Sequence, residues 1–126
     1  MPGLLFAHAL VPAFCEEAIR SSYLFYLGDR GSRRNVVFSL GAVFVVGEIL
    51  YDASLYPLAK AEIGGALSAS LLAFAILSGT CLHIALTFWT AYRQKLGQNA
   101  WIVFALALAA HATFNLIALI ALGAIL

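Results

Sequence analysis

Residues 100–126 read AWIVFALALAAHATFNLIALIALGAIL, a run that contains no aspartate, glutamate, lysine or arginine. A helix needs about 20 residues, at a rise of about 1.5 Å each, to cross the hydrocarbon core of a bilayer. An apolar stretch of this length is typical of transmembrane segments. The run therefore predicts a membrane-spanning helix, and the rest of the chain is interpreted from it.

The composition of the whole chain supports the same class. Of its 126 residues, 63% are hydrophobic and 10% are charged, whereas soluble domains carry about 25% charged residues. A chain this short also lacks the interior volume to bury so much apolar surface. The net charge is +1 with no basic stripe, so no nucleic-acid partner is expected, and the two cysteines lie in apolar runs, which argues against a disulfide scaffold. We expect an all-α, polytopic membrane protein.

Polar clusters divide the chain into four apolar segments, which we expect to form one transmembrane domain over residues 1–126. The clusters lie at residues 28–34, 60–62 and 93–99. The predicted spans are residues 3–27, 35–59, 63–93 and 100–126. The third segment is too long for a perpendicular crossing, so we expect it to tilt, or to break near Gly64 and Gly65 or at Gly79.

The charges of the predicted loops indicate how the chain is oriented. The second loop holds only Lys60, whereas the first and third hold Arg30, Arg33, Arg34, Arg93 and Lys95. Loops rich in lysine and arginine stay in the cytoplasm. We therefore expect an integral, multi-pass protein in the lipid bilayer, with the first and third loops cytoplasmic and both termini on the other side.

Polar side chains inside the predicted spans are the candidates for function, because a charge at the bilayer centre costs at least about 2.5–3.5 kcal/mol. The main candidates are Glu16, Glu17, Arg20, Glu48, His83, His111 and Asn115. Each helix places one of its ionisable candidates roughly 10–14 residues from the same membrane face, a depth of about 15–21 Å. His8 and Asp52 lie nearer the opposite face. The common depth predicts a buried polar site shared by a four-helix core.

Carboxylates and imidazoles around a water molecule are suited to amide hydrolysis, and two mechanisms remain open. In the first, a buried glutamate takes a proton from water, Arg20 keeps one of the two adjacent glutamates ionised, and His111 and Asn115 donate hydrogen bonds to the oxyanion. In the second, Glu48, His83 and His111 hold a zinc ion with an open coordination position. The HExxH motif is absent, so local spacing does not support zinc.

Four short motifs occur in order on the four predicted spans. They are EEAIR at residues 16–20, FVVGE at residues 44–48, a histidine at residue 83, and HATFN at residues 111–115. This series resembles that of the PrsW family of membrane proteases, which reads EExxK, FxxxE, a histidine motif and HxxxN. The PrsW family belongs with the CAAX prenyl endopeptidases and the bacteriocin-processing proteins. The resemblance covers essentially the whole chain.

The resemblance implies hydrolysis of a peptide bond in a membrane-associated protein or peptide. It implies that Glu16 is the water-activating base, that Glu17 is its partner, and that His111 and Asn115 bind the oxyanion. Glu48 would occupy the position where CAAX enzymes carry a histidine. His83 would be an accessory ligand or a proton shuttle, and Arg20 stands where PrsW-type sequences carry a lysine. Family members usually carry extra helices around this core, so a second copy or a partner subunit could complete it.

Two other functions use the same residues. In a non-catalytic scaffold subunit, the polar layer would only join the helices to one another. In a transporter of protons or metal ions, the acidic and imidazole side chains would line the path. Against transport, the four segments show no inverted repeat, and the arginine would repel a cation. The leading prediction is therefore an intramembrane endopeptidase.

Overall fold

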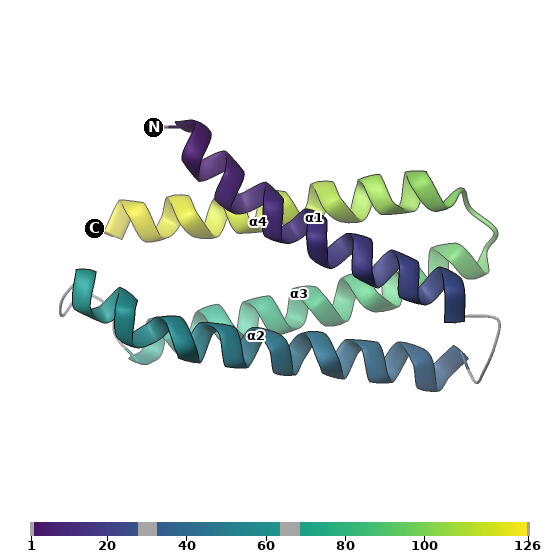
Figure 1. Cartoon of the computed structure of the whole chain (residues 1–126), viewed down its shortest axis with the longest axis horizontal. Coiled ribbons are helices and arrows are strands. Elements are labelled where there is room, and N and C mark those ends of the chain that lie inside the picture. Colours follow the sequence, from purple (N-terminus) through teal and green to yellow (C-terminus); the bar gives the residue numbers. More distant parts are fainter. Residues whose placement is uncertain (1, 28–32, 64–68, 126) are drawn as a thin grey trace.

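The structure, a computed structural model, describes residues 2–27, 33–63 and 69–125, and these residues are helical apart from a short turn at residues 96–99. The four helices are α1 (Pro2–Leu27), α2 (Arg33–Ile63), α3 (Ala69–Lys95) and α4 (Ala100–Ile125). They alternate in direction, so that the two ends of the chain lie at the same end of the molecule (Figure 1). The all-helical class predicted from the composition is confirmed.

Most helix ends lie close to the predicted polar clusters. Helix α1 ends at Leu27 and α4 begins at Ala100, as predicted, whereas α2 continues past residue 59 to Ile63. The predicted bounds of the third span, residues 63–93, are wrong, because residue 63 belongs to α2 and α3 is Ala69–Lys95. Charged side chains near the end of a membrane helix can extend toward the interface, so they need not terminate it. Helix α3 is continuous through Gly79, which excludes a break there. The alternative break near residues 64–65 lies outside the described residues.

The turn between α3 and α4 explains why one helix ends and the next begins. Gly97 has a φ of 72°, a left-handed conformation that glycine adopts without steric cost. Its N–H donates to the carbonyl of Gln94 at 3.0 Å, and that of Gln98 donates to Arg93 at 3.3 Å, the paired bonds of a Schellman cap. Asn99 then caps α4, because its side-chain oxygen accepts from the N–H of Trp101 at 2.9 Å.

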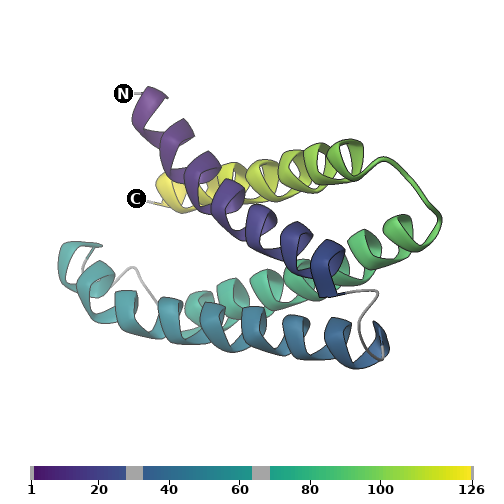
Figure 2. The same cartoon turned by 45° about the vertical axis from the view of Figure 1, so that its right-hand side comes forward.

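The helices pack as two pairs, α1 with α4 and α2 with α3 (Figures 1 and 2). Ala9, Ala13 and Ala107 are fully buried within the first pair. Small residues let helix backbones approach closely in a membrane, where apolar side chains gain little from leaving lipid. Phe14 of α1 and Phe104 of α4 add an edge-to-face contact, with ring centroids 5.8 Å apart.

A small hydrophobic cluster connects the two pairs near the end of α1. It consists of Leu24 of α1, Val37 and Leu40 of α2, and Ala91 of α3. These residues lie where α1 ends, α2 begins and α3 approaches its last turns. The cluster therefore fixes α1 against α2 and α3 about one to two turns from the polar residues of α1.

The distribution of polar and apolar side chains is reversed relative to a soluble domain. Arg20, Glu17 and His83 are at most 2% exposed, whereas Trp101 and Phe25 are 79% and 70% exposed. In water, large exposed apolar surfaces are unfavourable and rare. This arrangement fits a protein whose solvent is lipid.

Three of the four helices are long and apolar enough to cross a membrane, within the part of the chain that the structure describes. The apolar windows are Arg34–Tyr51 in α2, Leu72–Lys95 in α3 and Ala100–Ile120 in α4. Helix α1 differs because it carries Glu16, Glu17 and Arg20 within little more than one turn.

Candidate active site

Six of the seven predicted site residues form one connected cluster of side chains. Helix α1 provides two glutamates and an arginine, and each of the other helices provides one residue. The six are Glu16, Glu17, Arg20, Glu48, His83 and His111. The seventh, Asn115, faces the backbone of α1 instead, where its Nδ2 donates to the carbonyl oxygen of Ala9 at 3.3 Å. The side chains of His8 and Asp52 lie outside the described residues.

A buried ion pair on α1 is the centre of the cluster. Nη1 of Arg20 donates to Oε1 of Glu17 one helical turn away, and both side chains are completely buried. The guanidinium also lies over the ring of Phe44, with its central carbon 4.4 Å from the ring centroid. A buried charge is tolerated only when it is paired and hydrogen-bonded. The pair therefore depends on the partners that surround it.

Two histidines from different helices supply those partners. Nη2 of Arg20 lies 2.7 Å from Nδ1 of His83, and Oε1 of Glu17 lies 2.8 Å from Nδ1 of His111. The two imidazole rings meet edge to face, with centroids 5.1 Å apart. Phe44 stacks on the other side of His83 at a centroid distance of 5.5 Å. The rings are thus held both by hydrogen bonds and by aromatic contacts.

Glu16 faces the second nitrogen of each histidine. Its Oε2 lies 3.5 Å from Nε2 of His83 and 3.7 Å from Nε2 of His111. This oxygen is buried and has no hydrogen-bond partner in the structure, although the side chain as a whole is 31% exposed. Buried polar atoms are normally hydrogen-bonded. Glu16 therefore presents an acceptor that a bound molecule can use.

Glu48 faces the same nitrogen of His83 as Glu16 does and lies against a glycine of α3. Its Oε2 lies 3.3 Å from Nε2 of His83. A Cβ atom on Gly79 would collide with Oε1 of Glu48 and would lie 3.2 Å from its Cδ atom. Gly79 therefore leaves the space that the Glu48 carboxylate occupies. Gly79 lies one turn before His83, so both residues are on one face of α3.

The cluster also contains a set of atoms that a metal ion could bridge. Ligand atoms of Glu16, His83 and His111 all lie within 4.8 Å of one another. The predicted zinc set had Glu48 in the place of Glu16, so the carboxylate of this set comes from α1 and not from α2. Both sets require Nε2 of His83 to coordinate the ion.

The hydrogen bond from Arg20 does not fit that requirement. A guanidinium has only donors, so Nδ1 of His83 must accept, and the single proton of the neutral ring then resides on Nε2. A histidine coordinates zinc through an unprotonated nitrogen. With Arg20 in this position, the neutral ring of His83 offers zinc no free nitrogen, so the donor set does not fit a zinc ion.

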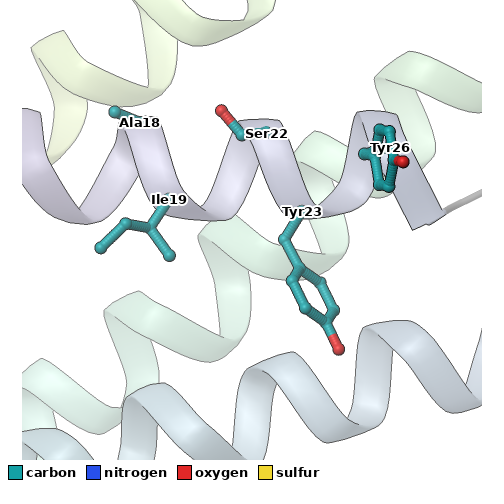
Figure 3. Close-up of a pocket in the computed structure, with 5 residues that line it drawn as sticks. All are labelled: Ala18, Ile19, Ser22, Tyr23 and Tyr26. Atoms are coloured by element: carbon teal, nitrogen blue, oxygen red, sulfur yellow. The ribbon is translucent and has the colours of Figure 1, made fainter.

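A separate pocket of about 540 Å³ lies along the outside of α1. It is lined by Ala18, Ile19, Ser22, Tyr23 and Tyr26. Figure 3 shows Ile19 and Tyr23 on the side of α1 that faces α2, and Ala18 and Ser22 on the opposite edge. None of the seven predicted site residues lines it. The first lining residue, Ala18, is two residues beyond Glu16, so the pocket is a neighbour of the cluster and not its interior.

Three features of the cluster were not predicted from the sequence. These are the bond between Arg20 and His83 across two helices, the close approach of Glu48 to Gly79, and the contact of Asn115 with the backbone of α1. Each depends on how the helices are rotated about their axes.

The chain matches no protein-family model, and neither the curated proteins nor the solved structures include a significantly similar protein.

Proposed function

We propose that the chain is an intramembrane endopeptidase that hydrolyses a peptide bond in a membrane-associated protein or peptide. The observation that carries the proposal is the position of Glu16, whose unpartnered Oε2 faces Nε2 of both His83 and His111. A carboxylate of α1 and the imidazoles of α3 and α4 therefore surround one site. These groups can activate water and stabilise the charge that develops on a carbonyl oxygen.

The proposed reaction needs only groups of the chain and one water molecule. Glu16 takes a proton from water, and the oxygen of that water attacks the carbonyl carbon, whose π electrons move to the carbonyl oxygen. Hydrogen-bond donors of the site stabilise this oxyanion. The tetrahedral intermediate then collapses, the carbon–nitrogen bond breaks, and the amine leaves with the proton from Glu16. One water molecule is consumed and Glu16 is regenerated.

The exposure of the two adjacent glutamates supports their different roles. The side chain of Glu16 is 31% exposed, whereas that of Glu17 is completely buried. Glu17 is also engaged by Arg20 and His111. A base must reach the proton that it takes. Glu16 has the access, and Glu17 has the partners of a structural carboxylate.

The proposal includes a four-span arrangement in which α1 is the span that carries the base. The direction of the helices alternates and both ends of the chain lie at one end of the molecule, as four crossings require (Figure 1). The loop charges favour an orientation with both termini on the non-cytoplasmic side. The resemblance to the PrsW family adds support from the order of the motifs along the chain.

The test compares two glutamate substitutions in purified protein reconstituted into proteoliposomes. The substrates are a mixed set of single-span membrane polypeptides with a fluorescent label at each end, and products are identified by mass spectrometry. Glu16→Gln should lower turnover about 100- to 10,000-fold, since it removes a general base. Glu62→Gln, the same chemical change near the end of α2, should leave turnover unchanged. Equal turnover in Glu16→Gln and the unmodified protein would exclude Glu16 as the base.

One observation favours a non-catalytic scaffold subunit as the second candidate. The Glu17–Arg20 pair joins α1 to α3 through His83 and to α4 through His111, so the cluster ties three helices together. In a scaffold, substitution of these residues would lower stability, and no product would form with any substrate. Cleavage by the unmodified protein, lost in Glu16→Gln at unchanged stability, decides against the scaffold.

A further inference from the structure

The two histidines of the cluster have different partners at the same ring nitrogen. Nδ1 of His83 lies 2.7 Å from Nη2 of Arg20, and Nδ1 of His111 lies 2.8 Å from Oε1 of Glu17. All four side chains are at most 3% exposed, so water does not compete freely for these bonds. The chemistry of each partner then determines what each nitrogen does.

The two partners impose opposite tautomers on neutral rings. An arginine can only donate, so Nδ1 of His83 accepts and the ring proton is on Nε2. An ionised carboxylate can only accept, so Nδ1 of His111 donates and its Nε2 carries a lone pair. The second nitrogen of a histidine is commonly set in this way by the bond that the first one makes.

We propose that the Glu17–Arg20 ion pair fixes His83 as a hydrogen-bond donor and His111 as an acceptor at the two Nε2 atoms that face Glu16. Glu17 and Arg20 are then positioning residues, because they act through the imidazoles. Glu17 and Arg20 both belong to α1 and are three residues apart. One turn of one helix therefore sets which nitrogen carries the proton in a histidine of α3 and in a histidine of α4.

The donor at Nε2 of His83 and the acceptor at Nε2 of His111 can take different roles in catalysis. This assignment of roles rests on the proposed function. Nε2–H of His83 can donate to an oxyanion, and without substrate it can donate to Oε2 of Glu48, 3.3 Å away. The lone pair on Nε2 of His111 can accept from the same water that Glu16 activates. The resemblance implies that His111 and Asn115 bind the oxyanion, whereas the hydrogen bonds favour His83 as the donor.

Nitrogen NMR measures the tautomers directly, without a substrate. The chain has three histidines, so protein with ¹⁵N-labelled histidine in lipid bilayers gives few signals. His83→Gln and His111→Gln each remove one ring and thereby assign the spectrum. We expect an Nε2–H ring for His83 and an Nδ1–H ring for His111 at neutral pH. The same tautomer in both rings, or a doubly protonated ring, would overturn the proposal.

Substitutions of Arg20 separate positioning from a merely structural role. Arg20→Gln introduces an amide that can accept as well as donate, so part of the His83 population should shift to Nδ1–H. Arg20→Lys keeps a pure donor and should restore the Nε2–H form. Arg93→Gln, a change on α3 outside the cluster, should leave both spectra unchanged. An unshifted His83 in folded Arg20→Gln protein would contradict the proposal, and the spectrum of the unmodified protein still tests it if that variant does not fold.

The result of the nitrogen NMR experiment is independent of the peptidase assay. Opposite tautomers in a protein that cleaves nothing would keep the ion-pair proposal and remove the function. Cleavage by a protein whose two rings share one tautomer would keep the function and remove the positioning role of Glu17 and Arg20.

Discussion

Replacing Gly79 with alanine puts a methyl group where the Glu48 carboxylate now lies. The added Cβ would be 3.2 Å from Cδ and 3.3 Å from Cγ of Glu48, and it would collide with Oε1. Since α3 is continuous at this point, its backbone cannot easily move away. The side chain of Glu48 is 24% exposed and can rotate outward. That rotation breaks its 3.3 Å contact with Nε2 of His83.

The expected cost follows from two opposing contributions. Loss of a hydrogen bond to a charged group costs about 1.5–3 kcal/mol. Alanine in a helix interior is about 1 kcal/mol more favourable than glycine, which offsets part of this. The net effect is a destabilisation of about 0.5–2 kcal/mol. Gly41→Ala is the matched control, because a Cβ there meets nothing within 4 Å. It should stabilise the protein by up to about 1 kcal/mol.

The measurement is the free energy of unfolding in mixed micelles, in a double-mutant cycle with Glu48→Ala. In the Glu48→Ala background the collision is absent, so Gly79→Ala should have the same stabilising effect as Gly41→Ala. The difference between the two backgrounds should be about 1.5–3 kcal/mol. If Gly79→Ala and Gly41→Ala are equally stabilising in the unmodified protein, the inference that Gly79 positions Glu48 is wrong.

Three further predictions address the metal, the helix contact and the aromatic support. Treatment with a zinc chelator should leave cleavage in proteoliposomes unchanged, because Arg20 keeps the proton of His83 on Nε2; loss of cleavage that added zinc restores would contradict this. Asn115→Ala should lower the free energy of unfolding by about 1 kcal/mol with little change in turnover, since its amide donates to the Ala9 carbonyl, and a selective loss of turnover would return Asn115 to the oxyanion site. Phe44→Leu removes the stacking on His83, so we expect a loss of about 0.5–1.5 kcal/mol in unfolding measurements; a stability equal to that of the unmodified protein would exclude this support.

The number of helices and most of their ends could be predicted from the sequence because polar clusters interrupt the apolar runs. The end of α2 could not, since Lys60 and Glu62 lie within the helix and not in a loop. In the proposed arrangement these residues lie near a membrane interface, where a charge avoids the penalty that it would meet deeper in the bilayer. Polarity therefore predicts a helix end only where turn residues such as Gly97 and Asn99 accompany it.

The membership of the site could be predicted from depth, but its contacts could not. Counting along each helix placed His83, His111 and the glutamates in one layer, and the structure brings these residues into contact. The rotation of each helix remained unknown, because α3 and α4 are apolar on both their lipid-facing and protein-facing sides. Rotation decides which of Glu16 and Glu48 contacts both histidines. It also decides whether Arg20 reaches His83.

The contacts of Arg20 also explain how α1 can carry three ionisable residues among apolar helices. Alone in lipid, the charges of Glu17 and Arg20 would lack partners beyond each other and would be costly. In the structure, His83 contacts the guanidinium of Arg20, His111 contacts the carboxylate of Glu17, and Phe44 covers the guanidinium. These partners come from α2, α3 and α4, so α1 is fully accommodated only when the other three helices surround it. Assembly of the bundle and formation of the polar cluster are therefore coupled, and His83 and His111, which are proposed to act on substrate, also hold α1 in place.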